Sequence, residues 1–283
     1  MVSRIGVVGG GLMGSGIVEV NARAGLDVVL VEVSPDAANA ARARVDESLA
    51  KAESRGKITA DERGEILGRI RFESDLNALA DRDLVVEAAS EDEQVKLALF
   101  EQLGKIVEAP EAVIASNTSS IPIVKLGAVS QRAGNVMGVH FFNPAPIMKL
   151  VELIPSLTTA PETTERMRSF VTDALGKEPI EASDRAGFVV NSLLVPYLLS
   201  AIRMYEAGYA SAVDIDKGMV LGCGHPMGPL ALADLIGLDT VRSIGVSLYE
   251  EFKEPLYAPP PLLDRMVEAG LLGNKSGHGF YPH

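Results

Sequence analysis

Cysteine, basic residues and long apolar segments are all scarce in this sequence. Its 283 residues include a single cysteine, Cys223, which excludes an intramolecular disulfide and fits a reducing compartment. Lysines and arginines number 26 against 38 aspartates and glutamates, so the formal net charge is −12. A chain this acidic is unsuited to broad binding of nucleic acids or anionic membranes, and an anionic ligand would need a local basic patch.

The longest apolar segment, residues 188–202, is interrupted by Asn191, Ser192, Pro196 and Ser200. It is too short and too polar to predict a membrane span. The N-terminus enters a predicted strand at once, which leaves no room for a signal or transit peptide. We therefore expect a cytoplasmic protein, with enough hydrophobic residues, at 47%, for one large domain or two.

The most informative segment spans residues 4–32 and reads RIGVVGGGLMGSGIVEVNARAGLDVVLVE. A short apolar run precedes Gly9, Gly11 and Gly14, which form the pattern G-x-G-x-x-G. A helical pattern and a second apolar run follow, and Glu32 lies 23 residues beyond Gly9. Three glycines alone are weak evidence, but together with this context they predict a dinucleotide-binding βαβ unit.

Each part of this unit has a chemical task. Gly9 allows the tight turn out of the strand, Gly11 lets the backbone approach a pyrophosphate, and Gly14 lets the helix pack closely. The start of the helix offers free N–H groups to the phosphates. Glu32 would bind the ribose hydroxyls and repel a 2′-phosphate, which favours NAD over NADP. The alternative is a tight turn beside a surface acid, with no ligand. Among the apolar positions of the helix are Leu12, Ile17, Val20 and Ala24.

Apolar runs of strand length alternate with helical patterns up to about residue 183. This alternation predicts an α/β fold with a mostly parallel, doubly wound, Rossmann-type sheet. Beyond residue 187 only helical periodicity remains, in segments near 188–207, 212–221, 227–237, 239–253 and 260–270. We therefore expect a sheet domain of residues 1–185, followed by an all-helical domain of residues 186–283.

Two helix starts can be predicted from capping residues. Ser34 and Pro35 suit the N-cap and first position of one helix. Ser90 and Glu93 have the spacing of a capping box at the start of another. The apolar periodicity of this second helix predicts an inward face formed by Val95, Leu99, Leu103 and Ile106.

Two polar residues stand within otherwise apolar strands. His140 ends one predicted strand, and Glu152 lies inside the run KLVELI. A buried carboxylate is costly unless it is paired. A carboxylate beside His140 would fix the ring tautomer and suit the imidazole to proton transfer. The alternatives are a histidine bonded only to a backbone carbonyl and an outward-facing acid on an edge strand.

Other candidates are less specific. The polar run of residues 116–120 ends a strand where such sheets bind ligands, but spacing does not choose among its serines. Asn191 lies among apolar residues and needs partners, which two helices could supply. A helical stripe contains Arg44, Ser48, Lys51 and Arg55, and, taken alone, it is better explained by a solvated face. Metal-ligand spacings are not found.

Taken together, seven short motifs resemble the L-3-hydroxyacyl-CoA dehydrogenases, in particular the stand-alone bacterial 3-hydroxybutyryl-CoA dehydrogenases. They are residues 9–14 (GGGLMG), 116–120 (SNTSS), 140–146 (HFFNPAP), 149–152 (KLVE), 187–191 (GFVVN), 226–229 (PMGP) and 275–281 (KSGHGFY). The resemblance covers essentially the whole chain, and nothing in it resembles a fused enoyl-CoA hydratase domain.

The resemblance implies an enzyme that interconverts (3S)-3-hydroxyacyl-CoA and 3-oxoacyl-CoA by hydride transfer to or from NAD. His140 would take the 3-hydroxyl proton, and Glu152 would hold and charge-balance that histidine. Ser119 would hydrogen-bond the reacting oxygen, while Asn191 would help to position the substrate. The substrate implied is short, 3-hydroxybutyryl-CoA or acetoacetyl-CoA.

The resemblance also implies the binding residues. Those for NAD are Gly9, Gly10, Gly11, Leu12, Met13, Gly14, Glu32, Glu91, Lys96, Ser119, Asn143 and Lys275. Those for the CoA ester are Ser48, Arg55 and Ser119, so the basic stripe becomes a predicted site. Relatives form homodimers through the helical domain, and we expect the same here, with no nucleic-acid or membrane partner.

One of the departures from the family pattern concerns the cofactor, and two alternative functions share the scaffold. Glu32 stands where relatives often have aspartate, so NADP remains an alternative cofactor. A related dehydrogenase of sugar acids such as gulonate would share this scaffold, and so would a catalytically silent nucleotide-binding protein. Activity on acetoacetyl-CoA, compared with activity on free hydroxy acids, separates these functions.

Overall fold

The computed structural model describes residues 2–283 and divides them into two compact units, the first ending at Arg185 and the second spanning Ala186–His283. The first unit contains an eight-stranded sheet in the order β3-β2-β1-β4-β5-β6-β7-β8. Its strands are β1 (Arg4–Val8), β2 (Asp27–Val31), β3 (Ile70–Glu73), β4 (Leu84–Glu87), β5 (Val113–Ser116), β6 (Val136–Phe141), β7 (Leu150–Pro155) and β8 (Glu178–Glu181).

Neighbouring strands of this sheet are parallel, except that β6 and β7 run antiparallel. The strand order runs from β1 through β2 to β3 on one side and from β4 to β8 on the other, so it reverses at β1. Ligands of doubly wound sheets bind beyond the carboxyl ends of the strands at such a switch point. The predicted doubly wound α/β fold is confirmed.

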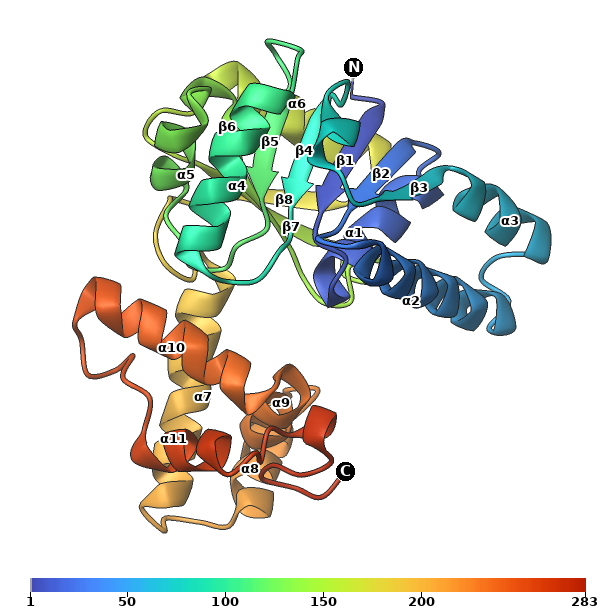
Figure 1. Cartoon of the computed structure of the whole chain (residues 1–283). Helices are drawn as coiled ribbons and strands as arrows, with labels where there is room; N and C mark the ends of the chain where they lie inside the picture. The colour runs from blue at the N-terminus through green and yellow to red at the C-terminus, as the bar shows by residue number, and fades with distance from the viewer. Residues whose placement is uncertain (1) are drawn as a thin grey trace. The chain divides into compact units, whose positions relative to one another are not determined.

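Helices flank this sheet, with α1 and α2 beside β1–β3 and α4 and α5 beside β4–β6 (Figure 1). The helices are α1 (Leu12–Arg23), α2 (Pro35–Ser54), α3 (Ala60–Gly68), α4 (Glu93–Ile106), α5 (Ile123–Ser130) and α6 (Pro161–Ser169), and a π-helical turn follows at Phe170–Ala174. The core joins strand side chains to those of α1, α2 and α6. Val7, Ile17, Leu30, Val45 and Met167 are completely buried in it.

Of the two predicted helix starts, only one is correct. Ser34 Oγ accepts a hydrogen bond from the N–H of Ala37, and Pro35 opens α2 as expected. The predicted capping box of Ser90 and Glu93 is wrong, because α4 begins at Glu93 itself. The cap is Asp92, whose carboxylate accepts from the N–H of Val95 at 3.0 Å.

The inward face of α4 agrees with the prediction at Leu103 but differs from it in the first turn. Lys96, Phe100 and Leu103 are its buried residues, whereas Val95 is 42% exposed. A charged side chain occupies an inward position because a carboxylate of the sheet, described below, pairs with it. Apolar periodicity cannot foresee such an exchange, so it assigned the wrong face to this turn of the helix.

The second unit is helical throughout, as predicted. Its helices are α7 (Val190–Glu206), α8 (Ala212–Cys223), α9 (Pro229–Ile236), α10 (Leu238–Phe252) and α11 (Pro261–Glu268). Leu198, Ile202, Leu230 and Val241 are fully buried in its core. Asp234, also fully buried, accepts hydrogen bonds from the backbone N–H groups of Phe280 and Tyr281, which fixes the last segment of the chain on α9.

Within residues 2–283, no helix combines the length and the apolar character that crossing a membrane requires.

Candidate active site

The loop between β1 and α1 has the shape that its glycines predict. Gly9 adopts a positive φ of 92°, and a Cβ there would lie 2.8 Å from the backbone of Ala88 and Ala89. A Cβ on Gly14 would come within 1.8 Å of the Gly9 carbonyl oxygen, so only glycine lets α1 pack this closely. Both glycines are therefore required by local packing.

Gly11 differs from these two glycines. Apart from Gly11 itself and its two chain neighbours, no described residue has an atom within 4 Å of the position that its Cβ would occupy, and no side chain caps the start of α1 there. The adjacent Leu12, predicted on the apolar face of this helix, is 69% exposed. Open backbone at a free helix N-terminus suits a pyrophosphate, so the loop fits the dinucleotide that the motif predicts.

Glu32, which follows β2, lies against the same loop. Its Oε1 accepts a hydrogen bond from the N–H of Gly10 at 2.6 Å, and the residue is half-buried. The Gly10 carbonyl accepts from Arg44 Nη1 at 3.1 Å. The predicted ribose-binding acid is therefore adjacent to the predicted phosphate loop, as the βαβ unit requires.

His140 and Glu152 form a buried pair on the neighbouring strands β6 and β7. The antiparallel register of β6 and β7 places them directly opposite each other. His140 Nδ1 lies 2.7 Å from Glu152 Oε2, and the two residues are 5% and 0% exposed. An outward-facing acid is therefore wrong for Glu152, and the predicted pairing of imidazole and carboxylate is present.

Ser119 extends this pair into a chain of three side chains. Its Oγ lies 3.0 Å from Nε2 of His140, on the side of the ring opposite Glu152. An ionised carboxylate only accepts hydrogen bonds, so Nδ1 of His140 carries the proton and donates to Glu152. In the neutral ring Nε2 then carries no proton, and its lone pair accepts from the Ser119 hydroxyl. Nε2 is accordingly the atom that can take up a proton.

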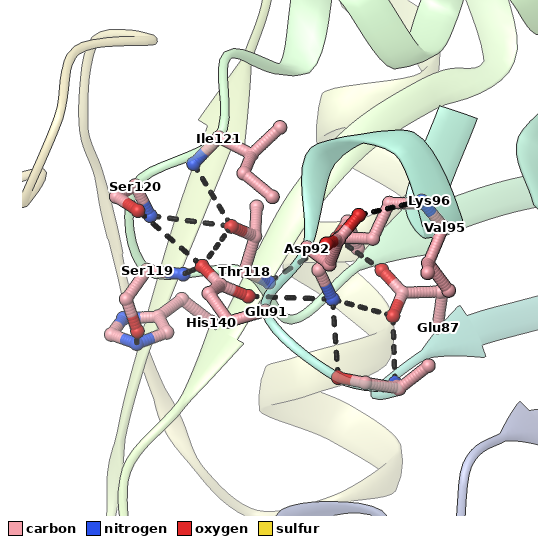
Figure 2. Close-up of polar contacts among 12 residues, drawn as sticks. Glu87, Glu91, Asp92, Val95, Lys96, Thr118, Ser119, Ser120, Ile121 and His140 are labelled. Atoms are coloured by element: carbon pink, nitrogen blue, oxygen red, sulfur yellow. Dashed lines mark hydrogen bonds and ion pairs between the residues drawn. The ribbon is translucent and has the colours of Figure 1, made fainter. Parts of the chain in front are cut away.

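The loop that carries Ser119 is held by Glu91, as Figure 2 shows. Glu91 Oε1 accepts from the N–H of Ser119 at 2.9 Å and from Thr118 Oγ1 at 2.5 Å. Lys96 Nζ lies 3.4 Å from the other carboxylate oxygen of Glu91. The structure thus brings Glu91 and Lys96, both predicted to bind NAD, next to Ser119.

One residue of this network escaped the sequence analysis. Glu87, the last residue of β4, is completely buried and lies 2.6 Å from Nζ of Lys96. The signal that singled out Glu152, an acid within an apolar strand, is equally present in the run DLVVEA. Asn117 was also missed; its Oδ1 accepts from the N–H of Phe141 at 2.8 Å and joins the serine loop to β6.

Two basic residues of the predicted CoA-binding stripe already form contacts within the protein. Arg44 points to Gly10, and Lys51 pairs with Glu47 at 2.7 Å. The hydrogen bond from Lys51 holds the pKa of the exposed Glu47 carboxyl below its usual value. Arg55 follows α2 directly and is exposed, and among residues 2–283 its guanidinium has no ion-pair partner. Ser48 is half-buried on the same helix.

The loop between β6 and β7 contains the exposed Asn143 and is fixed by a lysine. Lys177 Nζ donates to the carbonyl oxygens of Ala145 at 2.8 Å and Met148 at 2.5 Å. Burial lowers the pKa of Lys177. This buried lysine, which the sequence analysis did not single out, keeps the loop around Asn143 in place.

Two predicted site residues belong to the second unit. Asn191 is half-buried in the first turn of α7, and Lys275 Nζ lies 2.5 Å from the carboxylate of Asp239. Their roles in binding substrate and NAD stay predictions.

Known proteins carry the same combination of fold and motifs. A family model described as the NAD binding domain of 3-hydroxyacyl-CoA dehydrogenase matches residues 4–185. The model of the C-terminal domain of that enzyme matches residues 187–283. The chain belongs to the 3-hydroxyacyl-CoA dehydrogenase family. The predicted family and its NAD-binding dehydrogenase domain are thereby confirmed.

Individual members of the family are similar over the full length. The chain is 55% identical over 282 residues to a 3-hydroxybutyryl-CoA dehydrogenase of Mycobacterium tuberculosis, covering 100% of this chain and 99% of the relative. It is 41% identical over 290 residues to the human mitochondrial hydroxyacyl-coenzyme A dehydrogenase, covering 100% and 92%.

Solved structures of this family agree in fold. The crystal structure of M. tuberculosis FadB2 matches with a TM-score of 0.99 at 55% identity, covering 100% of this chain and 99% of that one. The (S)-3-hydroxybutyryl-CoA dehydrogenase PaaH1 of Ralstonia eutropha matches with a TM-score of 0.94 at 43% identity, with the same coverage.

Proposed function

We propose that this 3-hydroxyacyl-CoA dehydrogenase interconverts (3S)-3-hydroxybutyryl-CoA and acetoacetyl-CoA with NAD as its cofactor. The observation that carries the proposal is the chain of side chains from Ser119 through His140 to Glu152, at 3.0 and 2.7 Å. The short substrate is supported by the relatives that are named 3-hydroxybutyryl-CoA dehydrogenases.

Oxidation of a 3-hydroxyl group removes a hydride from C3 and a proton from the oxygen. The bound dinucleotide supplies the hydride acceptor in this direction and the hydride donor in the reverse one. His140 Nε2 takes the hydroxyl proton, and it returns that proton to the oxygen during reduction. Glu152 stabilises the imidazolium formed in between. Once the substrate hydroxyl donates to Nε2 in place of Ser119, the Ser119 hydroxyl donates a hydrogen bond to the reacting oxygen.

Most residues that would bind the two anionic ligands lie in separate parts of the first unit. The cofactor would lie along the glycine loop of residues 9–14, with its ribose hydroxyls at Glu32 and with Glu91, Lys96 and Asn143 at its far end. Ser48 and Arg55 on α2 would bind the CoA moiety, for which Arg55 offers an unpaired guanidinium. In the second unit, Lys275 would contribute to NAD binding and Asn191 to substrate positioning.

We also propose that the protein acts as a homodimer in the cytoplasm. The second unit exposes apolar side chains on α8, where Val213 is 61% and Leu221 is 73% exposed. Exposed apolar side chains on one helix favour a protein partner, and a second copy covers them in a symmetric dimer.

The proposed function is tested by following NADH oxidation with acetoacetyl-CoA and, separately, with free keto acids. We expect turnover with acetoacetyl-CoA and none with the free keto acids. His140→Ala should reduce kcat by about 100-fold or more while NADH still binds. His225→Ala, which removes a histidine that contacts Tyr197 in the second unit, is the control. An inactive wild-type protein, or a His140→Ala variant with near-normal turnover, would overturn the proposal.

A further inference from the structure

The carboxylate of Glu87 has no part in the reaction described above, although it is completely buried close to Ser119. Three donors converge on its two oxygens. Oε1 accepts from Lys96 Nζ at 2.6 Å and from the N–H of Ala89 at 2.7 Å, and Oε2 accepts from Ser116 Oγ at 2.6 Å. Burial of a carboxylate is costly, and an ammonium group with two further donors offsets that cost.

The first connection from Glu87 to Ser119 runs through Ser116. The two residues are neighbours in the parallel register of β4 and β5, so their side chains emerge on the same face. Ser116 Oγ, while it donates to Glu87, accepts from the N–H of Thr118 at 3.2 Å. Thr118 Oγ1 in turn accepts from the N–H of Ile121 at 3.0 Å. These bonds fix the backbone on both sides of Ser119.

The second connection runs through Lys96. Its ammonium group, 1% exposed, lies between Glu87 Oε1 at 2.6 Å and Glu91 Oε2 at 3.4 Å. Glu91 is the residue that binds the N–H of Ser119, and its side chain is 38% exposed. Glu87 is therefore the inner anchor of the lysine (Figure 2), and the lysine sets the place of the outer acid.

We propose that Glu87 is a positioning residue for the dehydrogenation. Through Ser116 and through the Lys96–Glu91 pair, it fixes the Ser119 backbone so that Oγ stays within hydrogen-bond reach of His140 Nε2. Without the charge on Glu87, Lys96 would pair with Glu91 alone and draw that carboxylate away from the N–H of Ser119. The inference rests on the proposed function, because it concerns the residue that holds the reacting oxygen.

Two variants test this role, and a third is their control. Glu87→Gln keeps the shape of the side chain but places an NH2 group among three donors, and Ser116→Ala removes a single hydroxyl. Glu93→Gln changes an acid on α4, the helix of Lys96, and the carboxylate of Glu93 pairs with Lys125 at 2.8 Å instead of with Lys96. We expect Glu87→Gln to lower kcat for acetoacetyl-CoA about 10- to 100-fold with KM changed less than about 3-fold, since a misplaced group costs rate. Glu93→Gln should leave both unchanged.

A double-mutant cycle distinguishes positioning from a general loss of structure. If Glu87 acts through Ser119, then Glu87→Gln in a Ser119→Ala background should lower kcat by less than about 3-fold. In the cofactor-free protein, the amide resonance of Ser119 in a ¹H–¹⁵N spectrum should shift in Glu87→Gln and Ser116→Ala, but not in Glu93→Gln. A structural role would instead lower kcat equally in both backgrounds.

The proposal is overturned if the factors by which Glu87→Gln and Ser119→Ala each lower kcat multiply in the double variant. It is also overturned if the chemical shift of the Ser119 amide does not change. Should Glu87→Gln fail to fold, Ser116→Ala carries the same cycle and the same spectrum. The wild-type assay with acetoacetyl-CoA decides the proposed function separately, and the amide spectrum reports on Glu87 whether or not that substrate is the correct one.

Discussion

His140 and Glu152 face each other as a directly opposed pair in the antiparallel ladder of β6 and β7. Their contact is therefore fixed by backbone register, because opposite residues of such a ladder share a face and their side chains meet. A slip of β7 by one residue would turn Glu152 to the other face of the sheet, away from His140. The proton-transfer geometry is thus a property of the sheet, and no mobile loop is needed to form it.

Replacing the carboxylate of this pair should slow the reaction without removing the fold. Glu152→Gln keeps the volume and one acceptor but loses the charge that stabilises the imidazolium. We expect kcat to fall about 10- to 1000-fold in steady-state assays, with the dissociation constant of NADH changed less than about 2-fold. Glu178→Gln, at an exposed position of the neighbouring strand β8, is the matched control. Equal kcat for both variants would exclude a role of Glu152 in proton transfer.

Two glycines of the cofactor loop should respond differently to alanine. Gly11→Ala adds a methyl group to open space, so the melting temperature should stay near that of the wild type while NADH binds at least about 10-fold more weakly. Gly14→Ala would place its methyl group 1.8 Å from the Gly9 carbonyl oxygen and should cost about 1–3 kcal/mol of stability. Thermal unfolding and NADH titration measure the two effects. Unchanged NADH affinity of Gly11→Ala would show that no phosphate approaches the loop there.

The pH dependence of stability should reflect Asp83. Although partial burial raises it, the pKa of Asp83 lies well below its usual range, because Arg4 and the N–H groups of Ser3 and Arg4 donate to the carboxylate. A depressed pKa contributes stability above the unfolded-state value of about 3.9, and this contribution is lost as the pH falls below it.

Asp83→Asn should therefore lose about 1–3 kcal/mol in urea unfolding at pH 7. The difference in unfolding free energy between Asp83→Asn and the wild type should become smaller at the lowest pH at which both proteins remain folded. Asp173→Asn, at an exposed position, is the control. A stability difference that does not depend on pH would show that the ionised carboxylate of Asp83 is not the cause.

Affinity for the CoA ester should depend on Arg55 more than on Lys51. Lys51 is already paired with Glu47 at 2.7 Å, whereas the guanidinium of Arg55 is free to bind a phosphate. We expect Arg55→Ala to raise KM for acetoacetyl-CoA about 5- to 20-fold with kcat nearly unchanged, and Lys51→Ala to raise it less. The effect of Arg55→Ala should shrink in high salt. The reverse order of the two variants would place the CoA phosphates elsewhere on α2.

The pair of His140 and Glu152 could be predicted from sequence because an acid in an apolar strand requires a partner. Glu87 meets the same criterion, but its partner Lys96 lies on a helix, where apolar periodicity assigned the inward face to Val95. Sequence patterns assume that buried positions are apolar. They therefore fail where two opposite charges are buried together, as they are next to Ser119.

Local chemistry also decided between competing helix starts. Ser34 is the only strong N-cap candidate before Pro35, and the prediction there is correct. Ser90 and Asp92 compete for the start of α4, and the structure selects the aspartate because the Ser90 carbonyl accepts from the N–H of Asp92 in a tight turn that precedes the helix. Spacing rules give each candidate separately, and the path of the turn chooses between them.

Gly10 has both of its backbone groups bonded before any ligand arrives. Its N–H donates to Glu32, and its carbonyl oxygen accepts from Arg44 and from Ser15 Oγ. The conformational entropy of the loop is therefore lost during folding, so the dinucleotide binds to a loop that is already ordered. Removing the hydrogen bonds from Arg44 and Ser15 to Gly10 should lower the affinity for the dinucleotide, mainly through a less favourable binding entropy.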